Sequence, residues 1–225
     1  MNRALPLLLS LSSILLPGCF FEDVGRPSGD DSGSPLDDSG DGPDDSGRDT
    51  DDSGDPPDDT GPDDTGDPDA LECDPSVVDW PEAWADLEAE VLVETNAVRA
   101  AGADCGVHGV MPPVGPLAME PHLRCAARVH ALDMGMRGYF DHDSEGGPLG
   151  DTFDERIHNA GYPSGWLGEN IAAGYPTPHD VVAGWVASDG HCANLMNGAY
   201  DDIGVGYAYV SESKYGAYWV QDFGG

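Results

Sequence analysis

Two long segments of the chain carry apolar residues at helical spacing. The first lies between Pro81 and Arg99 and is followed by Gly102, a residue type that often ends a helix. The second opens at Pro121, which suits the first turn of a helix, and ends near Gly138. The apolar stripes consist of Trp84, Leu87, Val91 and Val98 in the first segment, and of Leu123, Ala126, Ala127, His130, Ala131 and Met134 in the second. We expect two amphipathic helices and interpret His130 as a core histidine.

Shorter elements follow toward the C-terminus. Thr177 with Asp180 three positions later is a typical helix start, and apolar residues continue from there through Trp185. A short helical turn is expected over residues 153–157. Residues 203–210 and 215–221 are rich in β-branched and aromatic side chains, which predicts the two strands of a hairpin. Helices that precede strands in this way favour an α+β domain, with helices layered on a small antiparallel sheet.

The N-terminus has the pattern of an export signal. Arg3 precedes an apolar run over residues 5–16, which is too short to span a bilayer. The ending from Leu16 to Cys19 resembles the lipobox of bacterial lipoproteins, in which the cysteine is acylated. The resemblance implies a lipid anchor at Cys19 that holds the protein at the bacterial cell surface or outer membrane. The alternative is an odd thiol beside an ordinary cleavage site, which would make the protein secreted.

Residues 20–70 have the composition of a disordered spacer. Between residues 22 and 70 there are 19 acidic side chains and only Arg26 and Arg48, and Asp-Asp-Ser-Gly or Asp-Asp-Thr-Gly recurs six times. Such a segment cannot bury enough apolar surface to fold. A calcium site is conceivable, but the closing Glu of a calcium loop is missing. The whole chain has 9 basic and 43 acidic side chains, a net charge of −34, which argues against a nucleic-acid partner.

Residues 71–225 are expected to form one domain, and we expect it to be a monomer. The segment contains all five tryptophans and all eight tyrosines, and it is long enough to bury a core. Its four cysteines form an even set in an exported chain, so two disulfides are expected. The four are Cys73, Cys105, Cys125 and Cys192. Three pairings are possible, and the spacing alone does not select one.

Four short motifs occur in an order that matches a known family. They are Tyr139-Phe140-Asp141-His142, Gly168-Glu169-Asn170-Ile171-Ala172, the segment from Trp185 to Asn194, and Tyr218-Trp219-Val220-Gln221-Asp222-Phe223. Together with Asn96-x-x-Arg99 and the segment from Arg156 to Tyr162, they make residues 86–224 resemble the CAP superfamily. This superfamily comprises cysteine-rich secretory proteins, antigen 5, pathogenesis-related proteins and bacterial SCP-like proteins. The resemblance implies an α-β-α sandwich with a central cleft.

The same resemblance implies the residues of the cleft. His142, Glu169 and His191 occupy the positions of the two family histidines and the first acidic residue, whereas Ser188 stands where animal and plant members have a second Glu. His142 and His191, with Glu169, are therefore candidates to hold a divalent cation such as zinc. The alternative is that the histidines are half-buried core residues and that Glu169 accepts backbone N–H groups in a turn. A Ser188–His191–Glu169 triad has little support, since no nucleophile elbow surrounds Ser188.

Three further expectations depend on the resemblance. Bacterial relatives with two cysteines imply a Cys105–Cys192 disulfide and, by exclusion, Cys73–Cys125. Tyr162, Trp166 and Tyr175 flank Glu169 in a Gly/Pro-rich loop and are candidates for an aromatic ligand groove, with loop packing as the alternative. The leading function is a binding module on the cell surface, whose ligand is a lipid or sterol-like molecule, a glycan or a protein, with a divalent metal as an option in the cleft. A metal-dependent hydrolase and a structural envelope protein are the alternatives.

Overall fold

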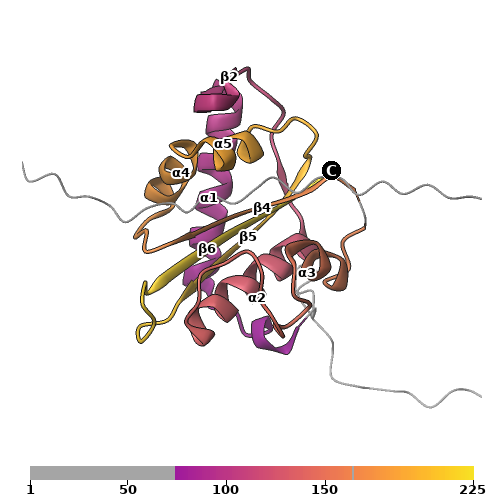
Figure 1. The fold of residues 1–225 in the computed structure, drawn as a ribbon, viewed down its shortest axis with the longest axis vertical. Helices are drawn as coiled ribbons and strands as arrows, with labels where there is room; N and C mark the ends of the chain where they lie inside the picture. Colours follow the sequence, from indigo (N-terminus) through magenta and orange to yellow (C-terminus); the bar gives the residue numbers. More distant parts are fainter. Residues whose placement is uncertain (1–73, 164) are drawn as a thin grey trace, which may run out of the picture. The chain divides into compact units, whose positions relative to one another are not determined.

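A four-stranded sheet lies between two layers of helices in the computed structural model, which describes residues 74–163 and 165–225 (Figure 1). The strand order is β3-β5-β6-β4. The predicted hairpin is confirmed as β5 (Asp202–Tyr209) and β6 (Ala217–Gly224), which are antiparallel. β4 (Leu167–Ala173) pairs antiparallel with β6 and forms one edge. At the other edge β3 (Ala118–Met119) adds one short parallel pair to the expected antiparallel sheet.

The helices divide between the two faces of the sheet. α1 (Glu82–Ala101), α4 (Pro178–Val186) and α5 (Asp189–Leu195) share a buried core with one face. α2 (Pro121–Arg137) covers the other face, and α3 (Phe153–Asn159) packs beside it. Short elements complete the fold: η1 (Pro75–Val77), β1 (Ala103–Asp104), η2 (Gly106–His108) and β2 (Val110–Met111). The α-β-α sandwich is confirmed.

Local chemistry sets the helix boundaries that the sequence predicted. The Glu120 carboxylate accepts a hydrogen bond from the Leu123 N–H at 2.7 Å, which caps α2 ahead of Pro121. Gly138, in the left-handed conformation, ends this helix. The Thr177 hydroxyl accepts from the Asp180 N–H at 3.2 Å and opens α4.

The alternation of β6 sends its side chains to two different cores. Trp219 and Phe223 face the core of α1, α4 and α5, whereas Tyr218 and Val220 face α2. Asp222 follows the second set and therefore points toward α2. Glu169 of β4 lies directly opposite Asp222, so the two acidic side chains share the α2 face of the sheet.

One segment near the candidate site differs from the expectation. The Gly/Pro-rich stretch around Glu169 was expected to be a loop, but residues Leu167–Ala173 form β4 and are mostly buried. The strand has no polar–apolar alternation because both of its faces are covered, which removes the signal that marks a half-buried strand.

Several predicted features lie outside the described residues. They are the export signal, the acylated Cys19, the spacer over residues 20–70 and Cys73, and they remain predictions, as does the start of the domain at residue 71. Within residues 74–163 and 165–225, no helix is both long enough and apolar enough to cross a membrane.

Candidate functional site

A buried carboxylate stands at the centre of the predicted site. Glu169 projects from β4 and its side chain is 1% exposed. His142, on the loop after α2, donates its Nδ1–H to Oε1 of Glu169 at 2.7 Å. Arg156 of α3 donates from Nη2 to Oε2 at 2.9 Å and is itself buried. Both oxygens of the carboxylate are therefore engaged, one by an imidazole and one by a guanidinium group.

His130 of α2 closes the same cluster from the helix side. Its Nε2 lies 4.0 Å from Oε2 of Glu169 and donates to the backbone oxygen of Asp141 at 3.0 Å. Burial lowers the pKa of His130 to about 4, so this ring is neutral at neutral pH. The prediction that His130 is a hydrogen-bonded core histidine is confirmed. Its contact with the loop at Asp141 helps to place the neighbouring His142.

The ionisation of Glu169 and His142 is set by their mutual contact. Burial alone would raise the pKa of Glu169, but His130, Arg156 and His142 outweigh burial and lower it. Burial also opposes protonation of His142, but the hydrogen bond and charge of Glu169, with the charge of Asp141, raise its pKa. Because His130 is neutral, Arg156 supplies the permanent positive charge. Glu169 is consequently an anion locked between Arg156 and His142.

His191 approaches from the opposite helical layer. It lies on α5, and its Nδ1 is buried with no hydrogen-bond partner among the described residues. Burial, and then the charge of His142, lower the pKa of His191 to about 4. The charge of His142 thus acts on His191, although the two residues come from different layers. His191 offers a neutral ring with an unused nitrogen.

Buried amides join α5 to the sheet beside His191. Asn170 of β4 donates its Nδ2–H to the His191 carbonyl at 3.2 Å and to Oε1 of Gln221 at 3.2 Å. Asn194 of α5 donates to the Glu169 carbonyl at 3.2 Å. Gln221 in turn donates to the Thr95 hydroxyl of α1 at 2.8 Å. These contacts fix the backbone of α5 relative to β4, and with it the two halves of the site.

A disulfide anchors the same helix from its outer side. Cys105, at the start of η2, is bonded to Cys192, the residue after His191, as the family resemblance implied. Cys125 is also disulfide-bonded, and its expected partner Cys73 lies outside the described residues. Asp189 adds a hydrogen bond from the Val107 N–H at 3.0 Å. The disulfide and this hydrogen bond therefore hold the loop at Cys105 against α5, the helix that carries His191.

Ser188 takes a structural position in the described chain. It is the N-cap residue of α5, and its hydroxyl makes no capping hydrogen bond. Its backbone oxygen accepts from the Cys192 N–H at 2.8 Å. No hydrogen bond joins the Ser188 hydroxyl to His191 in residues 165–225. The arrangement gives no support to a serine nucleophile.

The three aromatic residues proposed for a ligand groove occupy different environments. Tyr162 is buried against Gly224, and its hydroxyl donates to Asp202 at 3.0 Å. Tyr175 packs against the core of α1, α4 and α5, and its carbonyl accepts from the Trp219 indole at 3.0 Å. Trp166 is 62% exposed. Of the three, only Trp166 presents a broad surface to a ligand.

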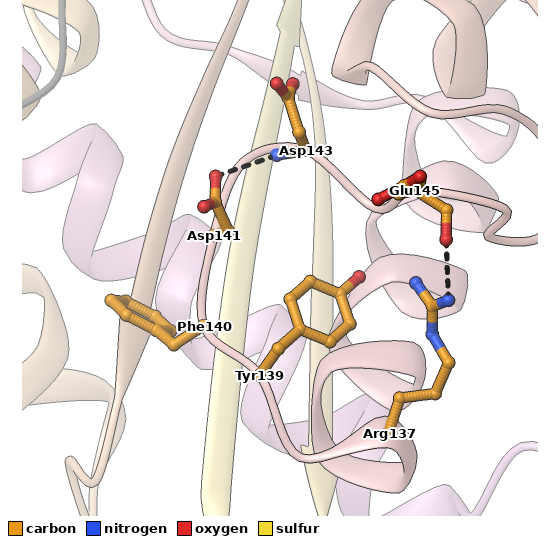
Figure 2. Close-up of a pocket in the computed structure, with 6 residues that line it drawn as sticks. All are labelled: Arg137, Tyr139, Phe140, Asp141, Asp143 and Glu145. Carbon is orange, nitrogen blue, oxygen red and sulfur yellow. Dashed lines mark hydrogen bonds between the residues drawn. The ribbon is translucent and has the colours of Figure 1, made fainter.

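A shallow hollow of about 380 Å³ lies on the loop that carries His142 (Figure 2). Its lining consists of Arg137, Tyr139, Phe140, Asp141, Asp143 and Glu145. Figure 2 shows the acidic side chains along the loop and the aromatic rings beneath it. His142 is not among the lining residues, although its chain neighbours Asp141 and Asp143 are, so the hollow lies along the same loop and does not include the imidazole.

The imidazoles of His142 and His191 are the donors of the predicted site that remain for a divalent cation. The Nε2 of His142 makes no hydrogen bond to any described residue, and a carboxylate behind Nδ1 is the usual support of a metal-binding histidine. Glu169 is engaged by Arg156 and is a supporting residue, not a ligand. Among residues 74–163 and 165–225, no three His, Cys, Asp or Glu side chains are arranged to hold one ion. A cation at His142 and His191 would take its other ligands from water or from a bound molecule.

Two residues near Glu169, Arg156 and Asp222, were not among the site residues predicted from the sequence. Arg156 belongs to a motif that the family resemblance used, but no role followed from its spacing. Asp222 is a charged residue inside an apolar strand pattern, and that mismatch is the signal of a buried polar contact. Neither residue's contact with Glu169 can be read from local periodicity, because the pairing depends on the tertiary arrangement of α3, β4 and β6.

Comparison with known proteins places this site in a family context. Residues 94–223 match the model of the cysteine-rich secretory protein family, CAP. The uncharacterized protein YkwD of Bacillus subtilis is 38% identical over 108 residues, which are 48% of this chain and 39% of that protein. The uncharacterized membrane protein YlbC of the same organism is 30% identical over 127 residues, 56% of this chain and 33% of that protein. This chain thus spans well under half the length of these relatives.

Solved structures give matches of the same kind. An extracellular protein of Bacillus anthracis that contains an SCP domain matches with 26% identity and a TM-score of 0.48, covering 64% of this chain and 43% of that chain. An outer surface protein of Borrelia burgdorferi matches with 21% identity and a TM-score of 0.48, covering 64% of this chain and 92% of that chain.

Proposed function

Because this chain belongs to the cysteine-rich secretory protein family, we propose that it is an exported, lipid-anchored binding module of the bacterial surface. Its ligand contacts the surface around His142 and His191, directly or through a divalent cation that the two imidazoles hold. Fold membership alone does not assign an activity, so the proposal depends on the groups that the site offers.

The observation that carries the proposal is the engagement of Glu169. Its two oxygens are bound by His142 at 2.7 Å and by Arg156 at 2.9 Å, in the interior. A carboxylate that is neutralised and enclosed in this way is a poor general base, because the partners that stabilise its charge oppose proton uptake. The groups that remain for a ligand are the Nε2 of His142 and the ring of His191. These imidazole groups can form hydrogen bonds with a ligand or bind a cation that contacts the ligand.

A metal-dependent hydrolase has less support from the same geometry. Catalytic zinc sites usually combine three protein ligands with an open position for water. Of the three predicted ligands, Glu169 is held by Arg156, so at most the imidazoles of His142 and His191 are left for an ion, and the described residues show no group of three ligands. If a cation binds, it supplies positive charge and open coordination positions for a ligand. The chain's own contribution is to orient His142 through Glu169 and to hold α5, with His191, against β4.

Zinc titration of the purified full-length protein tests the proposed site. We expect one zinc ion per chain by calorimetry, and loss of that binding in His142→Gln and in His191→Gln. His158→Gln is the matched control, because His158 lies exposed on α3. The wild type and both variants are also assayed against a casein and an ester substrate. Zinc-dependent turnover that both substitutions abolish would replace the binding module with the hydrolase.

Ligand class is tested on the same proteins without added metal. A glycan array and vesicles of phosphatidylglycerol and phosphatidylethanolamine are probed with wild type, Trp166→Ala and His142→Gln. We expect binding to one class of probe to weaken at least tenfold in His142→Gln, and Trp166→Ala reports whether the exposed indole takes part. Unchanged binding in His142→Gln would place the ligand elsewhere on the molecule.

The anchor requires a separate experiment. We expect mass spectrometry of the membrane-extracted N-terminus to find acylated Cys19, and Cys19→Ser to move the protein into the soluble fraction. An unmodified mature N-terminus downstream of Cys19 would instead mean simple secretion.

A further inference from the structure

A second buried acid lies behind the candidate site. Asp222 is on β6 directly opposite Glu169 on β4, and the side chains of the pair face α2. Counted as whole residues, backbone included, Asp222 is 1% exposed and Glu169 is 5% exposed. Across the other edge of β6, Asp222 faces Gly204, which has no side chain to offer. The two carboxyl groups are therefore neighbours in a space closed off from water.

No donor among the described residues forms a hydrogen bond with Asp222, and the buried Nε of Arg156 is likewise without a partner. Neither carboxyl oxygen of Asp222 accepts a hydrogen bond from an N–H or hydroxyl group of the described residues. The charged and titratable groups nearby are directed at Glu169: His142 from the loop and Arg156 from α3 bond it, and His130 from α2 lies 4.0 Å away. An ionised Asp222 would be buried, without a hydrogen bond, beside a second anion. That arrangement is strongly unfavourable.

A protonated Asp222 removes both penalties. It carries no charge, and its O–H can donate to the carboxylate of Glu169 across the strand pair. Burial, and then the negative charge of Glu169, raise the pKa of Asp222 well above its usual range, although Arg156 acts in the opposite direction. This pattern is typical of two carboxyl groups that share a site, of which one stays protonated.

We propose that Asp222 is the second acid of this site, a neutral carboxylic acid that donates a hydrogen bond to Glu169 and so positions Glu169 against His142. The proposal rests on the proposed function for the relevance of His142. The second Glu that animal and plant family members carry is replaced by Ser188, and a different acid enters from β6, on the interior side. Because that acid is uncharged, it adds no further negative charge to those of Glu169 and Asp141 that act on His142.

Infrared spectroscopy of the full-length protein tests the protonation state directly. At neutral pH we expect a C=O stretching band of a protonated carboxyl group in the wild type, and its loss in Asp222→Asn. Asp133→Asn is the matched control: Asp133 is also buried, but it accepts hydrogen bonds from Tyr139 at 2.6 Å and Arg137 at 3.1 Å, and we expect the band to persist in this variant. Absence of the band from the folded wild type would overturn the proposal without any variant.

Proton titration of His142 by NMR tests the positioning role. Asn at position 222 keeps a neutral donor, so Asp222→Asn should leave the pKa of His142 unchanged. If Asp222 were ionised, the same substitution would remove a negative charge and lower the pKa of His142, which would overturn the proposal. Asp222→Val removes the donor, and we expect a raised pKa of His142, because Glu169 then loses a competing hydrogen bond.

These measurements separate this inference from the proposed function. Neither the infrared band nor the titration of His142 requires a metal or a ligand. Failure of zinc and of the lipid and glycan probes to bind at His142 and His191 would overturn the binding module while leaving the protonated Asp222 intact. A lowered His142 pKa in Asp222→Asn would overturn Asp222 alone.

Discussion

At the scale of single residues, the site depends on the balance between one buried anion and one buried cation. Glu169 and Arg156 are each 1% exposed in their side chains and lie 2.9 Å apart. A buried ion pair adds little net stability compared with apolar packing, but removal of one partner leaves the other charge uncompensated. The pair is therefore a point of high sensitivity, and it also fixes the carboxylate that holds His142.

Substitution of Arg156 should demonstrate that sensitivity. We expect Arg156→Met to reduce the free energy of unfolding by about 3 to 5 kcal/mol, the range found when a buried pair loses one partner. The measurement is equilibrium unfolding in urea. Arg137→Gln is the control, because Arg137 bonds Asp133 from a much more exposed position and should change the stability far less. Equal effects of the two substitutions would contradict this account.

A second prediction concerns the two neutral histidines. The pKa values of His130 and His191 are lowered from 6.5 to about 4 by burial, so protonation favours the unfolded chain. Their contribution is complete above pH 6.5 and is lost as the pH falls toward 4. For His130, which is fully buried, the loss is of the order of 3 kcal/mol.

Between pH 6.5 and 4.5, the loss of stability caused by protonation of His130 can be measured without a contribution from Glu169. Glu169, whose pKa is lowered, contributes stability that is lost only below its ordinary value of 4.5, whereas a protonated Asp222 and the raised pKa of His142 add stability as the pH falls, in the wild type and in the variant alike. The stability of the wild type relative to His130→Gln, measured by urea unfolding, should therefore fall as the pH is lowered from 6.5 to 4.5. The same pH dependence in both proteins would contradict the neutral, buried state of His130.

The residues of the site divide into those that sequence reasoning reached and those that it did not. His142, Glu169 and His191 were found because short motifs carried them into a known family pattern. Arg156 and Asp222 were not assigned, since an arginine on a short helix and an aspartate inside an apolar strand have no local pattern that specifies a partner. Their contacts with Glu169 exist only after three separate elements have packed together.

At the scale of elements, the periodicity of apolar residues predicted the amphipathic helices and the hairpin, but it missed the strand whose two faces are both covered. α1, α2 and α4 and the β5–β6 hairpin were predicted from their patterns, with small differences at the ends. β4 was taken for a loop because both of its faces are covered and its sequence contains Gly, Glu and Asn. α5 has seven residues and β3 has two, so neither element is long enough to produce a periodic pattern of apolar residues.

The disulfide allows a prediction about α5. Cys105 and Cys192 are separated by 87 positions, so their bond restricts a long loop of the unfolded chain. We expect Cys105→Ser combined with Cys192→Ser to lower the free energy of unfolding by about 4 to 5 kcal/mol by the loop-entropy estimate. We also expect zinc affinity to fall, since Cys192 adjoins His191. Stability measured by urea unfolding and affinity by calorimetry check the two effects, and an unchanged stability would show that the bond does not restrain the unfolded chain as assumed.

The packing of α2 on the sheet gives a prediction about glycine. A Cβ added at Gly204 of β5 would overlap the backbone of Leu123 and Arg124, so the helix lies directly on the strand. We expect Gly204→Ala to cost about 1 to 3 kcal/mol, the usual effect of overpacking, because backbone atoms cannot rotate away. Gly115→Ala is the matched control, since nothing lies within 4 Å of its added Cβ. Thermal unfolding of both variants checks the difference, and a Gly204→Ala protein as stable as the control would mean that α2 shifts freely.

At the scale of the whole molecule, acidic side chains greatly outnumber basic ones. The chain carries 43 acidic and 9 basic side chains. Within the described residues, Arg99 and Arg156 are buried, and Arg124 and Arg128 bond the buried Glu88 at 2.9 and 2.7 Å. Four of the six basic residues that the structure describes are therefore buried or paired with a buried acid, which leaves an excess of acidic side chains on the surface of the described part. Such a surface repels itself and repels polyanions, while it attracts cationic partners.

This distribution predicts that salt stabilises the protein. Self-repulsion among exposed acids is screened when the Debye length falls from about 30 Å at 0.01 M to about 8 Å at 0.15 M salt, whereas buried pairs such as Glu169–Arg156 are screened much less. Raising NaCl over that range should therefore increase the free energy of unfolding by about 1 kcal/mol, equivalent to about 2 to 4 °C in Tm. Choline chloride in place of NaCl is the control for specific sodium binding and should give the same increase. A Tm that falls with either salt would mean that exposed ion pairs outweigh the repulsion, and that the acidic surface is not the dominant electrostatic feature of the fold.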